Sequence, residues 1–176
     1  MGLKMRILDG TESDLPAIVA IFNDAVVNTT AIWSDVLATV EARKTWMEQR
    51  RAGGFPVFVA KNEADEVVGF ASYGPYRPFD GFRLTVEHSV YVRPDQRGKG
   101  VGGKLLDALI THARGAGLHV MVGGITADNA ASITLHERRG FQQVGLLPQV
   151  GVKFGRWLDL AFLQLKLDDL PHPKAD

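Results

Sequence analysis

The spacing of apolar residues predicts an alternation of helices and strands along the chain. From a cap at Thr11 or Ser13 to about Val27, apolar residues recur every three or four positions, which is typical of a helix with one buried face. The same spacing follows Gly100 and ends before Gly115, a residue type that favours helix termination. The expected helices therefore cover residues 14–27, 40–51, 101–114 and 129–139.

Short apolar runs between these helices predict strands. Two of the runs flank the turn NEADE and predict a hairpin, while RLTVEHSVYV leads into a glycine-rich segment. The expected strands cover residues 5–8, 55–61, 67–73, 83–92, 118–126, 141–147 and 156–167. This order predicts an α/β (α+β) fold, a mixed sheet layered with helices. We expect a single domain over residues 5–167 and a C-terminal tail over 168–176.

Composition narrows the class of protein. Hydrophobic residues make up 45% of the 176 positions and charged residues 23%, the balance of an ordinary globular domain. Twenty basic and twenty acidic residues cancel, which argues against a nucleic acid or an anionic membrane as partner. No apolar run approaches the roughly 18 residues of a membrane span, and the N-terminus lacks a signal-peptide pattern. These features predict a soluble cytoplasmic protein.

Residue types exclude some chemistry. The sequence has no cysteine, which rules out disulfides, thiolate metal ligands and a cysteine nucleophile. No histidine lies at metal-ligand spacing from another histidine or an acidic residue, so no metal is expected.

The segment VYVRPDQRGKGVGGKLL, residues 90–106, fits three phosphate-binding patterns at once. Residues 98–103 match the dinucleotide fingerprint G-x-G-x-x-G, and residues 98–104 match most of a Walker A loop. Residues 97–102 match R-x-x-G-x-G, the form found in loops that hold the pyrophosphate of coenzyme A.

Two of these patterns are incomplete. Walker A requires Ser or Thr after its lysine to ligate magnesium, and this position is Leu105. A Rossmann loop follows its strand directly and has an acidic residue about 20 positions later, whereas here RPDQ intervenes and VMVGGIT has no carboxylate. The coenzyme A pattern remains, because glycines let the backbone approach a pyrophosphate and the amides of the next helix point at it. A glycine-rich turn that binds nothing is the alternative.

The wider sequence resembles a known family. VEHSVYVRPDQRGKGVGGKLL followed by ADNAASITLHERRGF is similar to the acetyl-CoA-binding core of the GNAT superfamily of N-acetyltransferases. TVEHSVYV, SITLHERRGF and VGVKFGRWLDLAFLQL resemble the phosphinothricin and methionine sulfoximine acetyltransferase group, and NTTAIW and YRPFDGFR match its methionine sulfoximine members especially. The resemblance extends from about Met5 to Leu167. It implies a mixed, mostly antiparallel central sheet flanked by helices, and a homodimer.

The resemblance implies that acetyl-CoA is the co-substrate. Its pantetheine arm is expected to lie where the strand ending at Val92 splays from the strand at 119–126. The main chain of residues 90–92 would pair with pantetheine like an added strand, and the glycines would cradle the pyrophosphate. The residues implied in acetyl-CoA binding are Val90, Tyr91, Val92, Arg97, Gly98, Lys99, Gly100, Val101, Gly102, Gly103, Asn129 and Ser132.

The implied reaction is attack of a primary amine on the thioester, which requires a base because amines are protonated at neutral pH. Without cysteine, direct transfer in a ternary complex is favoured over an acetyl-cysteine. Glu87 is the candidate base, and an unbroken strand places it on one face with Ser89 and Tyr91. A surface carboxylate without a role is the alternative.

A second candidate catalytic residue lies on the helix after Asp128. Asn129, Ser132 and His136 fall at i, i+3 and i+7 and form one polar stripe. Many GNAT enzymes have a tyrosine at the position of His136, where it is thought to protonate the leaving thiolate. His136 is therefore either this acid or a group that positions water or the thioester, and a structural hydrogen bond is the alternative. The fold analogy assigns the oxyanion to a backbone amide, that of Val90.

The loop YGPYRPFDGFR carries the candidate substrate groups. Its two arginines, Arg77 and Arg83, match a carboxylate, and its aromatic residues suit a short side chain, as an α-amino acid requires. Solvated surface arginines are the alternative. The resemblance also places Trp33 and KFGRW at the pocket, across a dimer, whereas the sequence alone makes Trp33 a core residue. The residues implied in substrate binding are Arg77, Pro78, Phe79, Glu87, His88 and Ser89.

Together these features predict an acetyl-CoA-dependent N-acetyltransferase of the α-amine of methionine sulfoximine, methionine sulfone or phosphinothricin. One alternative is an N-acetyltransferase of another amine, such as a polyamine or a protein N-terminus. The two loop arginines argue against a polyamine, which requires an acidic pocket. The other alternative is a non-catalytic acetyl-CoA sensor, which Glu87 and the polar stripe disfavour.

Overall fold

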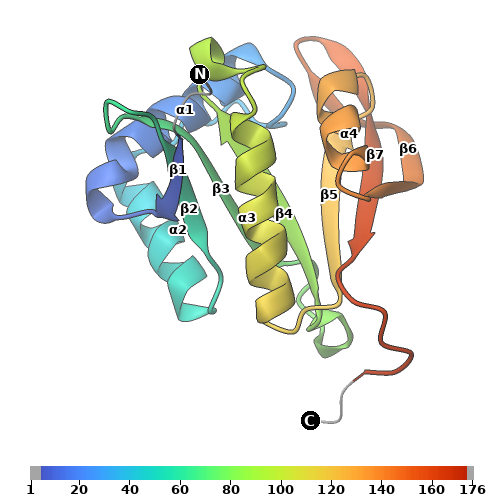
Figure 1. Cartoon of the computed structure of the whole chain (residues 1–176). Helices are drawn as coiled ribbons and strands as arrows, with labels where there is room; N and C mark the ends of the chain where they lie inside the picture. The colour runs from blue at the N-terminus through green and yellow to red at the C-terminus, as the bar shows by residue number, and fades with distance from the viewer. Residues whose placement is uncertain (1–4, 174–176) are drawn as a thin grey trace.

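Seven strands form one sheet in the order β1-β2-β3-β4-β5-β7-β6, and helices cover both of its faces (Figure 1). The computed structural model describes residues 5–173. The α-helices and strands in chain order are β1 (Arg6–Asp9), α1 (Leu15–Asn28), α2 (Val40–Ala52), β2 (Val57–Lys61), β3 (Val67–Pro75), β4 (Thr85–Val92), α3 (Val101–Gly115), β5 (Val120–Thr126), α4 (Ala130–Glu137), β6 (Gln142–Lys153) and β7 (Arg156–Lys166). The predicted α/β fold with a mixed, mostly antiparallel sheet is confirmed.

The α3 helix covers one face of the sheet, and α1 and α2 cover the other. The alternation of β4 divides its side chains between these two layers. Val86, Val90 and Val92 pack in the cluster beneath α3, whereas Tyr91 packs in the cluster beneath α1 and α2. The predicted separation of the two faces of this strand is therefore confirmed, and it decides which side chains reach which layer.

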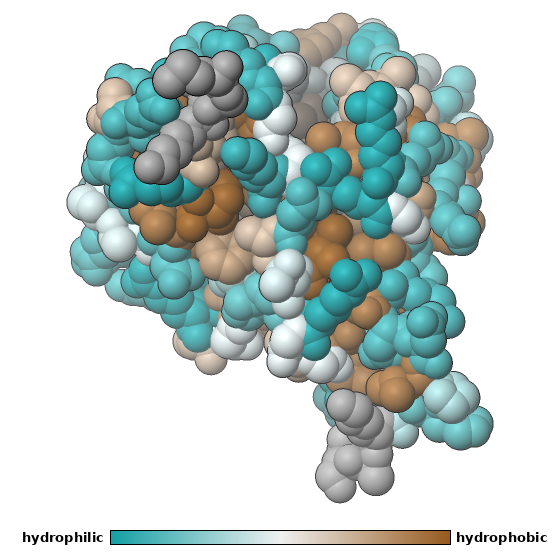
Figure 2. All heavy atoms as spheres, viewed as in Figure 1, coloured by the Kyte–Doolittle hydropathy of each residue, from teal (hydrophilic) through white to brown (hydrophobic). Residues whose placement is uncertain are grey.

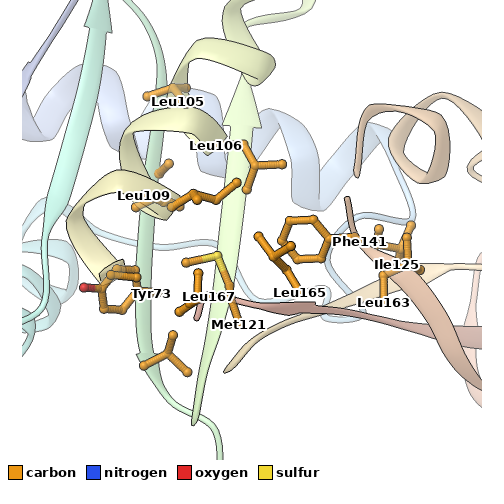
Figure 3. Close-up of a cluster of buried hydrophobic side chains, with 14 of the residues drawn as sticks. Tyr73, Leu105, Leu106, Leu109, Met121, Ile125, Phe141, Leu163, Leu165 and Leu167 are labelled. Carbon is orange, nitrogen blue, oxygen red and sulfur yellow. The ribbon is translucent and has the colours of Figure 1, made fainter. Parts of the chain in front are cut away.

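The apolar stripe predicted for α3 is buried in the core. Leu105, Leu106 and Leu109 are fully buried where α3 packs on β2, β3 and β4, in a cluster that continues to Met121 of β5 (Figure 3). Full burial of a leucine contributes roughly 1.5–3 kcal/mol. This packing fixes α3, and with it the glycine-rich segment at its N-terminus, against the sheet.

β4 and β5 form the one parallel strand pair among the described residues, and this pairing is short. It extends from Thr85 opposite Val120 to Glu87 opposite Val122. Beyond that point β4 stays paired with β3, and β5 stays paired with β7, so the two strands diverge (Figure 1). The predicted splay between these strands is confirmed.

β6 is longer than the sequence predicts. It continues from the expected end at residue 147 to Lys153, with a register shift between Leu147 and Gly151. Within this shift Gln149 has φ of 54°, and its N–H donates to the Asp159 carboxylate over 2.7 Å. A bulge interrupts the alternation of inward and outward side chains. The hydrophobic pattern therefore did not predict a strand over residues 148–153.

Candidate active site

A cavity of about 980 Å³ lies where β4 and β5 diverge. Of the residues predicted to bind acetyl-CoA, all except Lys99 line it. Of those predicted to bind the acceptor, Glu87, His88 and Ser89 line it, whereas residues 77–79 do not. The structure therefore joins the glycine loop, the middle of β4 and the start of α4 around one space.

The glycine loop has a backbone that favours glycine at two positions. Gly98 has φ of 73° and Gly100 has φ of 83°, in the left-handed region that other residues rarely adopt. No atom lies within 4 Å of a Cβ built on either glycine. Gly100 is the N-cap of α3, so the unpaired N–H groups of the first turn of this helix begin at the loop. The Arg97 side chain lies beside the loop and donates from Nε to the Val92 carbonyl over 3.2 Å.

Glu87 is half-buried on β4, where the pairing with β5 ends. Its Oε1 lies 3.3 Å from a Cβ built on Gly124 of β5, so the carboxylate lies against a strand position without a side chain. Burial raises the pKa of this carboxyl, and the charge of Arg77 opposes that rise. A carboxylate with a raised pKa binds a proton more readily than an exposed one.

His88 and His136 form a stacked pair on the opposite face of β4. Their ring centroids are 4.9 Å apart, and their Nε2 atoms are within hydrogen-bond distance. Nδ1 of His136 lies 2.6 Å from the Ser132 carbonyl, and Nδ1 of His88 is buried without a partner among the described residues. Burial and the neighbouring His136 lower the pKa of His88 to about 3, and burial lowers the pKa of His136. Both rings are therefore neutral near pH 7.

Gly123 makes room for this pair in β5. A Cβ at Gly123 would lie 3.0 Å from Nε2 of His88. The two consecutive glycines of VMVGGIT thus clear space for Glu87 on one face and for His88 on the other. Glycine inside a strand marks such close approaches, which is the signal that the sequence offered for this contact.

The loop after α1 forms another wall of the cavity. Thr29, Thr30 and Trp33 line it, and the indole N–H of Trp33 donates to the Thr30 carbonyl over 2.9 Å. Buried Lys153 donates to three main-chain carbonyls of this region, those of Val26, Thr29 and Ile32. Trp33 is therefore a wall residue of the cavity in its own chain, and the core position expected from sequence alone is wrong. The other segment that the resemblance implies, KFGRW, does not line this cavity. The three hydrogen bonds from Lys153 hold this wall of the cavity in place.

The predicted substrate loop lies at the surface. Arg77 is exposed with its guanidinium 4.5 Å from the centre of the Tyr76 ring, and Phe79 is 69% exposed. The charge of Arg77 nonetheless acts on the Glu87 carboxyl and opposes the rise in its pKa. Sequence reasoning missed a second arginine, Arg50 of α2, which does line the cavity.

Two further findings bear on the kind of site. Within residues 5–173 no group of three or more His, Cys, Asp and Glu side chains is arranged to hold a metal ion. No helix in that range is both long and apolar enough to cross a membrane.

Comparison with known proteins identifies the family. Residues 18–141 match the profile of the acetyltransferase (GNAT) family. The chain is 60% identical over 166 residues to an L-methionine sulfoximine/L-methionine sulfone acetyltransferase of Pseudomonas aeruginosa, covering 94% of this chain and 96% of that one. It is 36% identical over 158 residues to the phosphinothricin N-acetyltransferase of Alcaligenes faecalis, covering 89% and 80% of the two chains.

A solved structure agrees with these relatives. A putative acetyltransferase from Salmonella typhimurium, solved with its cofactor acetyl-CoA, superposes with a TM-score of 0.95 at 52% identity, covering 98% of this chain and 99% of that one. The fold, the glycine loop at the head of α3 and the sequence match agree, and the chain belongs to the GNAT family of acetyltransferases.

Proposed function

We propose that this enzyme transfers the acetyl group of acetyl-CoA to the α-amine of a small amino acid analogue, with methionine sulfoximine, methionine sulfone and phosphinothricin as the candidate acceptors. One observation carries the proposal: a single cavity connects the glycine loop with the carboxylate of Glu87. The activities named for the relatives at 60% and 36% identity support this acceptor class.

The residues around the loop fit acetyl-CoA. Main-chain N–H groups at the start of α3 suit a diphosphate, and Arg97 and the exposed Lys99 add positive charge. The β4 main chain beyond Glu87 has no β5 partner, so residues 90–92 offer a strand edge to the pantetheine amides. Acetyl-CoA held there supplies the thioester that the amine attacks. Asn129 and Ser132 line the same cavity from the start of α4.

Glu87 is assigned as the base that takes the proton from the attacking amine. Its raised pKa suits proton transfer near neutral pH better than that of an exposed carboxylate. The main-chain N–H of Val90 is assigned to the thioester oxygen as charge develops on it. No acetyl-cysteine can form in a chain without cysteine, which supports direct transfer.

The contacts of His136 support a positioning role. Its Nδ1 donates to the Ser132 carbonyl, so in the neutral ring Nε2 is an acceptor for the N–H of His88. Both nitrogens of His136 are thus engaged within the protein. We assign His136 to holding His88 against the cavity, in preference to protonating the leaving thiolate.

We also propose that the enzyme is a homodimer that pairs through β6. This strand is at the edge of the sheet, and an exposed apolar edge strand is a ready site for association. Figure 2 shows apolar residues among polar ones on the side where β6 and β7 lie. The exposed apolar residues of β6, of the turn that follows it and of the start of β7 are Val144, Leu146, Leu147, Val150, Val152, Phe154 and Trp157.

Measurement of thiol release tests the function. With acetyl-CoA present, we expect methionine sulfoximine or methionine sulfone to increase thiol release well above the rate without an amine. A polyamine and a peptide with a free N-terminus are the comparison acceptors. Faster release with either comparison acceptor would replace the proposed substrate class, and acetyl-CoA binding without any amine-dependent release would identify a sensor.

A further inference from the structure

Arg50 is a cavity-lining guanidinium that the acetyl-transfer mechanism does not use. It lies in the last turn of α2 and lines the cavity together with Pro75 and Glu87. Its Nε is buried and has no hydrogen-bond partner among residues 5–173. No carboxylate in that range forms an ion pair with Arg50, and burial lowers the pKa of its guanidinium. Arg50 as a whole is half-buried, and its guanidinium lies 5.9 Å from the centre of the Trp46 ring. Even a half-buried cation without an anion is costly, so its presence in a cavity points to a ligand that supplies the anion.

The Arg50 guanidinium lies against Gly74 of β3. A Cβ built on Gly74 would overlap Nη1 of Arg50, so the guanidinium occupies the space that any other residue would fill. Gly74 is paired with Glu87 across the β3–β4 ladder. Side chains of paired residues lie on the same face of a sheet. The guanidinium and the Glu87 carboxylate therefore face the same side of neighbouring strands.

This arrangement matches the head of an α-amino acid, whose amine and carboxylate are bonded to one carbon. An amine that gives its proton to Glu87 holds its carboxylate a few ångströms away, within reach of a group beside Gly74. A guanidinium binds a carboxylate through two parallel hydrogen bonds. We propose that Arg50 binds the α-carboxylate of the acceptor and thereby selects amino acids over simple amines. This inference rests on the proposed function, and it moves the carboxylate contact from the exposed Arg77 to the inside of the cavity.

The test compares methionine sulfone with 3-(methylsulfonyl)propan-1-amine, which is the same molecule without its carboxylate. In Arg50→Met, we expect kcat/KM for methionine sulfone to fall roughly 100-fold, as for truncation of one partner of a buried charge pair. In the same variant, kcat/KM for the amine and the KM for acetyl-CoA should stay within about three-fold of wild type. Arg50→Lys keeps the charge without the planar fork and should show an intermediate loss.

Gly74→Ala gives an independent test, because it displaces the guanidinium while Arg50 itself remains. It should reduce kcat/KM for methionine sulfone selectively, like Arg50→Met. The matched control is Arg51→Met, on the same turn of α2, which loses a contact with the Gly10 carbonyl and does not line the cavity. It should leave the ratio between the two acceptors unchanged. An equal loss on both acceptors in Arg50→Met, or no preference for the acid in the wild type, would overturn the inference.

Calorimetric binding separates this inference from the proposed function. Methionine sulfone is titrated into wild type and Arg50→Met, each saturated with coenzyme A. Suppose that methionine sulfone binds to the wild type and not to Arg50→Met, and that the wild type does not acetylate it. This result would overturn the proposed function and support the inference. Equal binding to both proteins would overturn the inference even if the wild type is active.

Discussion

Asp24 of α1 forms an ion pair with Arg97, the arginine that precedes the glycine loop, with 3.1 Å between Oδ2 and Nη2. The side chains are 25% and 46% exposed, so the pair is accessible to a ligand. A diphosphate that binds at the loop meets a guanidinium already engaged by a carboxylate. In the proposed binding mode, Asp24 therefore competes with the coenzyme for Arg97.

We expect Asp24→Asn to strengthen acetyl-CoA binding roughly two- to five-fold, because an accessible ion pair is worth about 0–1 kcal/mol. The measurement is calorimetric titration with acetyl-CoA at low salt, and the difference should shrink at high salt. Arg97→Met is the comparison and should weaken binding. Weaker binding in Asp24→Asn as well would mean that Asp24 holds the guanidinium in place for the ligand.

Glu87→Gln should reduce kcat at least roughly 100-fold, the contribution of a positioned general base. Acetyl-CoA affinity should remain close to wild type, because the loop that holds the coenzyme is unchanged. Turnover and binding are measured on the same preparation, with Glu41→Gln on the exposed surface of α2 as the control. A parallel loss of turnover and affinity would show that Glu87 is structural.

Arg77→Gln should shift the acidic limb of the kcat/KM profile to higher pH. Burial raises the pKa of Glu87, and the Arg77 charge opposes that rise. Removal of the charge therefore raises the pKa further, so the base is ionised only at higher pH. The profile is recorded for both proteins, with Arg77→Lys expected to keep the wild-type limb. An unshifted limb in Arg77→Gln would show that Glu87 does not control it.

His88→Phe should make the stability of the protein less sensitive to acid. The pKa of His88 falls from 6.5 to about 3 on folding, so between these values the unfolded chain binds one more proton than the folded one. Wild-type stability then decreases as pH falls, by roughly 1.4 kcal/mol per pH unit for this residue. Urea unfolding at pH 6.5 and 4.5 should give a smaller decrease in the variant. The same decrease in both proteins would contradict a neutral, buried His88.

Substitution on β6 should convert the proposed dimer to a monomer. Val152 is 62% exposed and pairs with Trp157 of β7, which is 65% exposed. Val152→Lys places a charge in the interface, which should cost enough to dissociate it. Light scattering measures the mass of wild type and variant, with Val36→Lys, at a 76% exposed position before α2, as the control. A monomeric wild type, or dissociation caused equally by the control, would overturn the β6 interface.

Local sequence determined much of the fold and the coenzyme side of the site. The helical stripe of α3, the two faces of β4 and the glycines before α3 each depend on residues close together in the chain. Hydrophobic periodicity predicts such features because the conformation of each of these residues depends mainly on its near neighbours in the chain. The glycine loop could therefore be identified together with the helix that it begins.

The acceptor side required the tertiary structure. Arg50 and Gly74 are 24 positions apart, and the contact between His88 and His136 spans 48. The hydrophobic periodicity of a helix or strand does not relate residues so far apart in the chain. An arginine near a helix end is also usually solvated. Only the packing of α2 and α4 on the sheet brings these side chains to the cavity, because contact across layers depends on how whole elements pack. The sequence by itself determined the glycine loop and the helix that follows it, and the folded sheet decided which charged side chains surround the cavity.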